Sequence, residues 1–154
     1  MRRRIFLMIP LFAWLMAFAP AANPWLVDFE EAQEAAQLSD KPILLVFSGS
    51  DWCKPCIRWE QEVFSTPEFE SFAQDHLILV RADFPRKRKN RLSEAQVQHN
   101  EALAAQFNPQ GYFPYALLLT AEGEILVSTS YRVGGTDQFI RYFHQMAPNQ
   151  LPLP

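Results

Sequence analysis

The two cysteines of this chain, Cys53 and Cys56, carry the strongest chemical signal in its sequence. An apolar run over residues 42–47 precedes them, and a helix-like stretch over 57–64 follows. This order predicts a strand that ends where a helix begins, so Cys53 is expected at the helix N-terminus, where free N–H groups and the helix dipole favour a thiolate. Side chains three positions apart on a helix are about 5–6 Å apart at Cβ, whereas a disulfide needs about 3.5–4.5 Å. The pair can therefore close with modest tightening, which suits a reversible redox pair.

Other interpretations of the two cysteines are less well supported. A purely structural bridge that closes so short a loop would constrain the unfolded chain little. Haem attachment would require a histidine after the second cysteine, where the chain has Ile57. A zinc or copper site needs more ligands, and no histidine stands at motif spacing. We therefore predict no metal and no cofactor beyond the disulfide itself, and we expect three surface histidines: His76, His99 and His144.

The first 22 residues have the pattern of a secretory signal peptide. Arg2–Arg4 form a charged region, residues 5–18 an apolar region, and residues 19–22 a stretch of small residues and one proline for cleavage. The apolar region is too short to span a bilayer comfortably, and an uncleaved anchor is the alternative. We therefore expect a periplasmic or secreted protein without stable membrane insertion after cleavage. In an oxidising compartment two cysteines are usually bonded to each other.

The composition indicates a single globular domain. The chain has 154 residues, of which 49% are apolar and 14% aromatic, and this is enough to build an ordinary core. Its net charge of −3 becomes −6 when the three arginines of the signal peptide are removed, so there is no electrostatic case for nucleic-acid binding. We place the domain at residues 23–147. The proline-rich residues 148–154 are expected to form a flexible tail.

Hydrophobic periodicity and turn residues predict alternating helices and strands. Helices are expected near 28–38, 53–64, 68–74, 93–107 and 136–146, and strands near 43–48, 77–84, 115–120 and 125–131. Asp28, Ser93 and Thr136 are the expected N-caps of three of these helices. Strands followed by helical crossovers indicate parallel pairing, and the last two strands add an antiparallel hairpin. The predicted fold class is α/β, with a mixed four-stranded sheet and helices on both faces.

Residues 86–91, here called the basic loop, contain five cationic side chains: Arg86, Lys87, Arg88, Lys89 and Arg91. A solvated loop is the simplest interpretation. Docking of an acidic partner or of an anionic envelope surface is the alternative.

These features together resemble the thioredoxin superfamily over residues 26–147, with an extra helix at the N-terminus. Trp52-Cys53-Lys54-Pro55-Cys56 after an apolar strand has the form of the family's central motif. Phe113-Pro114-Tyr115 at the start of the third strand looks like its cis-proline loop, and Gly134-Gly135 precedes the last helix as is usual there. The segments 49–53, 62–64 and 83–85 are similar to those of exported bacterial proteins of the disulfide-reductase type.

The resemblance implies specific roles for the site residues. Cys53 would attack as a thiolate and Cys56 would resolve the mixed disulfide. Pro114 would lie beside the disulfide, where its missing N–H leaves the backbone of a substrate free to pair. Trp52 would cover the site, and Lys54 and Pro55 would tune it. Three aromatic residues around Pro114 are candidates for substrate contact: Tyr112, Phe113 and Tyr115.

The chain also departs from the family. Thioredoxins carry a buried acid on the strand six positions before the first cysteine, and Phe47 stands there. Water or a nearby carboxylate, with Asp51 and Glu60 as candidates, would have to take the proton of the resolving cysteine. Lys54 favours a thiolate and an oxidising disulfide, whereas Pro55 resembles the reductants of the family, so the direction of electron flow stays open.

The resulting hypothesis is an exported thiol–disulfide oxidoreductase, a reductase or isomerase, that exchanges disulfides with protein substrates through Cys53 and Cys56. A reductase would also need a membrane-borne electron donor. The alternative from another class is a binding module that holds peptides around Pro114 without any thiol chemistry.

Overall fold

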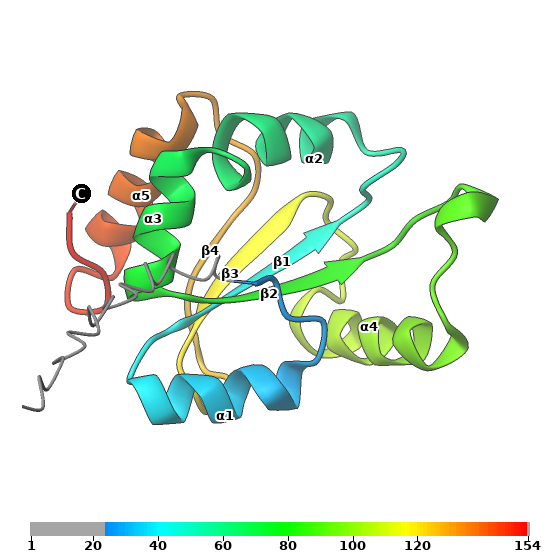
Figure 1. The fold of residues 1–154 in the computed structure, drawn as a ribbon, viewed down its shortest axis with the longest axis horizontal. Coiled ribbons are helices and arrows are strands. Elements are labelled where there is room, and N and C mark those ends of the chain that lie inside the picture. The colour runs from blue at the N-terminus through cyan, green and yellow to red at the C-terminus, as the bar shows by residue number, and fades with distance from the viewer. Residues whose placement is uncertain (1–23, 154) are drawn as a thin grey trace, which may run out of the picture.

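The computed structural model describes residues 24–153, so the expected signal peptide lies outside the described residues (Figure 1). The strands are β1 (Ile43–Ser48), β2 (Ile78–Asp83), β3 (Tyr115–Leu119) and β4 (Ile125–Thr129). The helices are α1 (Phe29–Ser39), α2 (Lys54–Trp59), α3 (Pro67–His76), α4 (Glu94–Phe107) and α5 (Gly135–Met146), and two short turns of helix are η1 (Glu60–Phe64) and η2 (Arg88–Asn90). No helix within residues 24–153 is long and apolar enough to cross a membrane. The predicted α/β architecture with an additional N-terminal helix is confirmed.

The four strands form one mixed sheet in the order β2-β1-β3-β4. β1 and β2 are parallel, with Ser48 opposite Asp83, and β3 is antiparallel to both β1 and β4. The expectation of parallel pairing after a helical crossover is therefore wrong for β3. The segment containing α4 returns the chain to the end of the sheet where β2 finished, so that Tyr115 starts β3 opposite Phe47 near the end of β1. From there β3 has to run backwards.

The sheet is buried on both faces, because α1 and α4 cover one side and α2, α3 and α5 cover the other (Figure 1). Successive residues of β1 alternate between the two cores, with Val46 on the side of α2 and Phe47 on the side of α4. Trp59 and Phe64 are buried in the first of these cores, as predicted. Both ends of the rigid sheet are thereby fixed, including the end where the cysteine helix begins.

Side-chain caps set several helix starts. Asp28 accepts hydrogen bonds from the N–H groups of Glu30 and Glu31, and Ser93 accepts one from Gln96, as predicted. The expectation for Thr136 is wrong, because α5 begins at Gly135 after Gly134 in a left-handed conformation. The Thr136 hydroxyl instead lies 2.7 Å from that of Thr66, the cap of α3.

The C-terminal segment packs against the domain at Leu151, in contrast to the expected flexible tail. Leu151 is 3% exposed and belongs to the core under α5. Its carbonyl oxygen lies 2.6 Å from His144 Nδ1. A single leucine among prolines is thus enough to hold the segment, because it finds an apolar site.

Candidate active site

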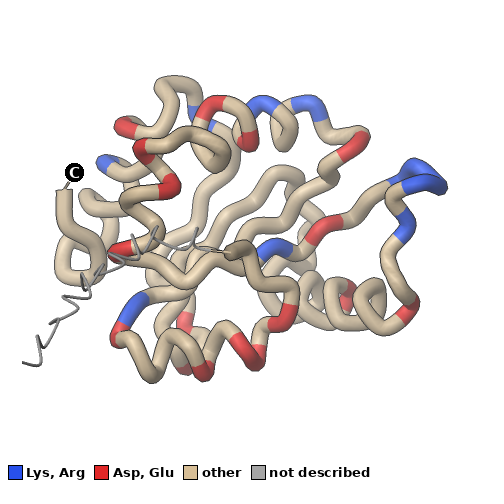
Figure 2. The backbone as a smooth tube through the Cα atoms, in the orientation of Figure 1, with Lys and Arg blue, Asp and Glu red and all other residues tan. Residues whose placement is uncertain are grey.

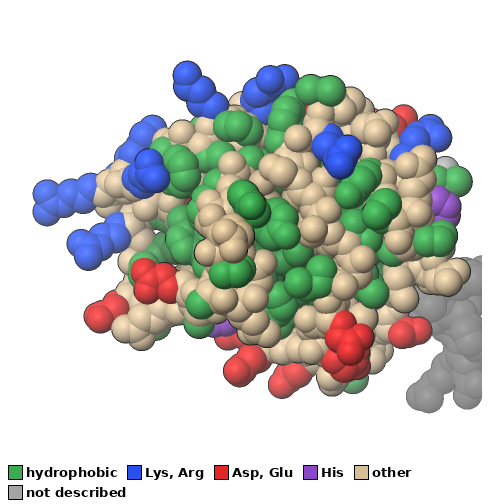
Figure 3. Space-filling model, turned by 180° about the vertical axis from the view of Figure 1, so that it is seen from behind, with side chains coloured by type: hydrophobic (Ala, Val, Ile, Leu, Met, Phe, Trp, Pro, Cys, Tyr) green, Lys and Arg blue, Asp and Glu red, His purple; other side chains and the backbone are tan. Residues whose placement is uncertain are grey.

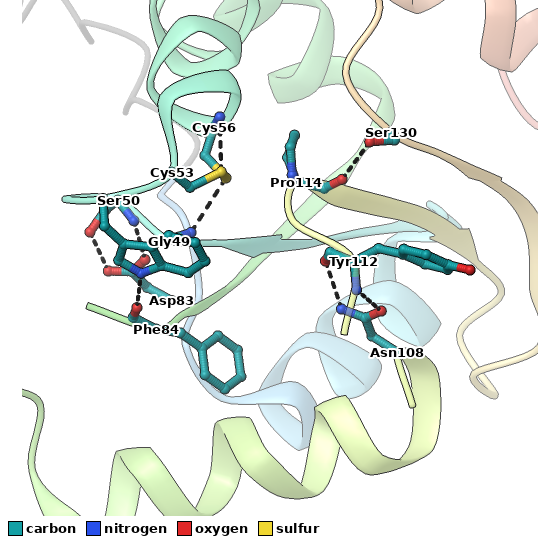
Figure 4. The surroundings of a disulfide bond; sticks show 11 residues. Gly49, Ser50, Cys53, Cys56, Asp83, Phe84, Asn108, Tyr112, Pro114 and Ser130 are labelled. Atoms are coloured by element: carbon teal, nitrogen blue, oxygen red, sulfur yellow. Dashed lines mark hydrogen bonds between the residues drawn. A yellow bond between two sulfur atoms is a disulfide. The ribbon is translucent and has the colours of Figure 1, made fainter. Parts of the chain in front are cut away.

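Cys53 and Cys56 are joined by a disulfide at the start of the cysteine helix, directly after the end of β1 (Figure 4). Cys53 is the N-cap of α2, and its Sγ accepts a hydrogen bond of 3.3 Å from the N–H of Cys56. The N–H of Gly49 donates to Cys56 Sγ over 3.5 Å. The helix start and the backbone donors would stabilise a negative charge on sulfur once the bond is reduced. This geometry is that of a reversible redox pair.

The two sulfurs are partly covered by their surroundings. Each cysteine exposes 4% of its surface, so a partner has to fit the residues around the disulfide to reach it. Pro114 faces the disulfide (Figure 4). The Phe113–Pro114 peptide bond is cis, and the carbonyl oxygen of Pro114 accepts a hydrogen bond of 2.8 Å from Ser130 Oγ.

Trp52 is fixed beside the cysteines by contacts on several sides. Its indole N–H donates to the carbonyl oxygen of Phe84 over 2.7 Å, and its ring meets that of Phe113 edge-on at 5.5 Å. The guanidinium of Arg86 lies 3.7 Å from the centre of the indole ring. A Cβ on Gly49 would stand 2.4 Å from the indole, so only glycine fits behind it. Trp52 therefore forms a rigid wall of the site.

The other predicted site residues do not all lie at the disulfide. Lys54 and Pro55 are exposed in the first turn of α2, where proline costs no helical hydrogen bond. Phe113 joins Trp52 at the site, but the Tyr112 ring points away from the disulfide (Figure 4) and stacks edge-on with Tyr115 at 5.7 Å. Of the three candidates for substrate contact, Phe113 is the one that packs against Trp52, the neighbour of Cys53.

Two aspartates clamp the loop before Cys53 to the segment after β2. Asp83 accepts hydrogen bonds from the N–H and the hydroxyl of Ser50 at 2.9 and 2.6 Å. Asp51 accepts three hydrogen bonds of 2.9 Å, from the N–H groups of Arg86 and Lys87 and from the Asn90 side chain. Sequence reasoning missed this clamp. A possible signal was the pair of acids at the ends of adjacent parallel strands.

A second carboxylate network holds the other side of the cysteine helix. Glu62 accepts a hydrogen bond of 2.6 Å from Tyr131 and pairs with Arg58 at 3.0 Å. The Tyr131 hydroxyl, followed by Arg58, lowers the pKa of Glu62, and the same carboxylate raises the pKa of Tyr131. The segment after β4 is thus tied to η1.

Phe47 is fully buried, so no acid lies beneath the cysteines at that position. The Asp51 carboxylate is bound to the basic loop. Glu60 begins η1, which continues α2 directly, and it lines a narrow space together with Cys56, Trp59 and Pro114. Its carboxylate pairs with Arg81 at 2.6 Å and accepts a hydrogen bond from Ser65. Arg81 also went unnoticed in the sequence, although a cation in the middle of an apolar strand is an unusual feature.

The histidines are spread over the domain and serve packing. His99 accepts a hydrogen bond from the N–H of Phe29, the His76 ring lies 4.8 Å from that of Phe72 at a tilt, and all three histidines are partly exposed. Within residues 24–153 there is no group of three or more His, Cys, Asp or Glu side chains that could hold a metal ion.

The clamp formed by Asp51 yields a prediction for its dependence on pH. The hydrogen bond from the Arg86 N–H is the main cause that holds the pKa of the Asp51 carboxyl below its ordinary value of 3.8. Desolvation opposes it, and the hydrogen bonds from Asn90 and Lys87 lower the pKa further. A lowered pKa means that the interaction is fully present above the unfolded value and is lost as the pH falls through the folded one. The amide NMR signals of Arg86 and Lys87 should therefore shift as the pH falls, with a midpoint below 3.8.

Asp51→Asn is the matched control for this titration, because it keeps an acceptor oxygen and removes the titrating group. In that variant the step below 3.8 should vanish from the Arg86 and Lys87 signals. A wild-type midpoint above 3.8 would contradict the assignment of the clamp.

Comparisons with known proteins agree with this geometry. A family model described as thioredoxin-like matches residues 24–121. The disulfide bond reductase DsbH of Chlamydia pneumoniae is 38% identical over 120 residues, which cover 78% of this chain and 70% of that protein. The thioredoxin-related protein DsbJ of the same organism is 33% identical over 110 residues, covering 71% of this chain and 30% of that protein.

A solved structure of a DsbH oxidoreductase has a TM-score of 0.76 at 31% identity and covers 97% of this chain and 96% of its own. The match thus extends over the whole described domain, including the additional helix α1. The chain therefore belongs to the thioredoxin-like family, and with its Cys53–Cys56 disulfide it is a thiol–disulfide oxidoreductase of the disulfide-reductase type.

Proposed function

We propose that this protein is exported and reduces disulfide bonds of other proteins through Cys53 and Cys56. The observation that carries the proposal is the disulfide at the first turn of α2, with the N–H of Cys56 directed at the sulfur of Cys53. A sulfur held there is stabilised as a thiolate and is the natural attacking group of the pair.

The reaction starts from the reduced pair. The Cys53 thiolate attacks one sulfur of a substrate disulfide, and the other substrate sulfur leaves and takes up a proton. The Cys56 thiol then loses its proton and attacks the Cys53 sulfur, which breaks the mixed disulfide and releases the second substrate thiol. The substrate gains two electrons and two protons, and the protein is left with the Cys53–Cys56 disulfide.

The residues around the pair take supporting roles in the proposal. Pro114 has no N–H that could bond to an extended substrate chain lying against it, so the backbone of that chain stays free to pair with neighbouring groups. Trp52 and Phe113 form an apolar wall at the opening, and the Lys54 ammonium adds positive potential near the thiolate.

The reducing direction is supported by the similarity to a protein named as a disulfide bond reductase and by Pro55, which resembles the reductants of the family. The pattern of residues 1–22 supports export to the periplasm or the exterior. In an oxidising compartment the spent disulfide has to be reduced again, so we propose a membrane-borne dithiol donor as the second partner.

A trapping experiment tests the assignment of the two cysteines. Cys56→Ala removes the resolving thiol, so mixed disulfides with substrate proteins should accumulate on Cys53 and be visible on non-reducing gels followed by mass spectrometry. Cys53→Ala is the matched control and should trap far less.

Two outcomes would contradict the proposal. Equal trapping by both variants would show that the roles of Cys53 and Cys56 are not those assigned. Full function in cells of the double variant Cys53→Ala/Cys56→Ala would favour the alternative of a binding module without thiol chemistry.

We further propose that Glu60 accepts the proton of Cys56 in the resolving step. Glu60 follows Cys56 by one helical turn, shares a narrow space with it and is 38% exposed at its side chain, so it can pass the proton on to solvent.

Glu60→Gln preserves an acceptor for Ser65 and removes the base. Since positioned proton-transfer groups contribute about 10²–10⁴-fold, resolution of the mixed disulfide should slow by about tenfold or more. Stopped-flow single turnovers of the reduced protein would measure this step, and the slowing should shrink as the pH rises towards that at which free thiols ionise. Asp51→Asn serves as the control, and a Glu60→Gln rate equal to that of the control would exclude Glu60 from proton transfer.

A further inference from the structure

A groove opens beside the disulfide, on the side of Trp52 away from the cysteine helix. It has a volume of about 630 Å³, and its floor and inner wall are the aromatic rings of Trp52, Phe84 and Phe113. The outer wall comes from Leu92, just before α4, and from Val97 in the first turns of α4. Trp52 precedes Cys53 and Phe113 precedes Pro114, so two residues of this groove are direct chain neighbours of the redox site.

The open edge of the groove is formed by the basic loop. Arg86 and Arg91 line the groove, and a second hollow of about 420 Å³ continues along Pro85, Arg86, Lys87, Arg88 and Arg91. Figure 2 shows this concentration of cations after β2, in a chain whose acids are spread over the other elements. In Figure 3 basic side chains project from one edge beside a hollowed apolar surface.

The cations of the loop are available for a partner. Among the described residues none of the five has an acidic side chain within ion-pair distance, as the two ion pairs found there involve Arg58 and Arg81. The nearby acids are engaged elsewhere, since Asp51 binds backbone N–H groups of the loop and Asp83 binds Ser50. Glu101 on α4 is the remaining acid in the groove lining.

The basic loop is also held in place, so its cationic side chains start from a fixed backbone before a partner binds. Asp51 accepts hydrogen bonds from the backbone N–H groups of Arg86 and Lys87 and from the side-chain amide of Asn90, and η2 gives the loop a helical turn. Arg86 stacks on the Trp52 ring at 3.7 Å, so the basic edge and the apolar floor are in direct contact. A fixed cationic edge costs little ordering entropy when a partner binds.

We propose that the groove and the basic loop dock an extended, acidic segment of a protein partner, with apolar side chains of that segment on the aromatic floor and its carboxylates on the basic loop. This inference rests on the proposed function and narrows its substrate class to disulfides flanked by acidic sequence. The concave shape and the position against Trp52 fit a peptide chain, whose carboxylates match arginine side chains in pairs of hydrogen bonds. The net charge of −6 without the three arginines of residues 1–22 would repel acidic partners elsewhere and direct them to this edge.

Single-turnover reduction of two synthetic peptides tests the proposal with the full domain. Both peptides contain one disulfide and the same apolar residues, and they differ only in carrying Asp and Glu or the isosteric Asn and Gln on one flank. At low salt the reduced wild-type protein should reduce the acidic peptide about tenfold faster in kcat/KM, and the preference should fall as salt screens the charges.

Arg91→Gln and Arg141→Gln form the matched pair of variants. Both remove one exposed arginine, but Arg141 lies on α5 at the other end of the molecule from the basic loop (Figure 1). Arg91→Gln should lower kcat/KM for the acidic peptide about two- to fivefold, the size of one exposed ion pair, and leave the amide peptide unchanged. Arg141→Gln should change neither. The combined variant Arg88→Gln/Lys89→Gln/Arg91→Gln should remove most of the preference.

Several results would overturn the inference, and they are distinguishable from failure of the proposed function. Equal reduction of both peptides by wild type, or equal effects of Arg91→Gln and Arg141→Gln, would refute acidic docking while leaving disulfide reduction intact. If neither peptide is reduced, the proposed function fails and the docking inference with it. Phosphatidylcholine vesicles with and without phosphatidylglycerol provide the other arm, since Arg91-dependent binding to the anionic vesicles with unchanged peptide kinetics would assign the loop to a membrane surface instead.

Discussion

The position of the Cys53 sulfur at the first turn of a helix is the constraint on which the rest of the structure depends. A sulfur can ionise there because the helix start offers N–H groups without partners, and the N–H of Cys56 is the one that reaches it. The buried strand β1 brings the chain to that point, and Gly49 allows the turn to pass beneath the Trp52 ring. The aromatic wall, the proline opposite and the two aspartate clamps are arranged around this one sulfur.

The clamps explain how the site and the basic loop act as one unit. β1 and β2 are parallel and end side by side, so the loops that follow them can be tied together by short acidic side chains. Asp83 holds the loop before the cysteines, and Asp51 holds the basic loop in return. The carboxylates of both aspartates are thus occupied by hydrogen bonds within the protein, and the cations of the basic loop face outwards.

The parts of the fold that depend on local sequence were predictable. The caps Asp28 and Ser93, the alternating burial along β1 and the helix after Cys53 all follow from neighbouring residues. The direction of β3 was not predictable from local sequence, because it depends on where the long segment containing α4 returns the chain. Packing of Leu151 depends likewise on an apolar site formed by distant residues.

The features of the site also separate into those that local sequence predicts and those that depend on distant residues. The motif around Cys53 and the proline at 114 could be read from the chain, since each is a contiguous pattern. The contacts of Arg86 with Trp52 and of Arg81 with Glu60 join residues far apart in sequence and needed the structure. The sequence offered no means of choosing between the two carboxylates suggested in place of the missing acid at Phe47. In the structure Asp51 is hydrogen-bonded to the basic loop, whereas Glu60 lies beside Cys56.

The reduction potential of the Cys53–Cys56 pair tests the central claim, electron donation to protein disulfides, most directly. Equilibration with glutathione or dithiothreitol buffers, followed by mass spectrometry of the alkylated thiols, would give its value. The account predicts a potential near −270 mV, about that of a reducing thioredoxin. A value near −120 mV, about that of a strong protein oxidant, would contradict it.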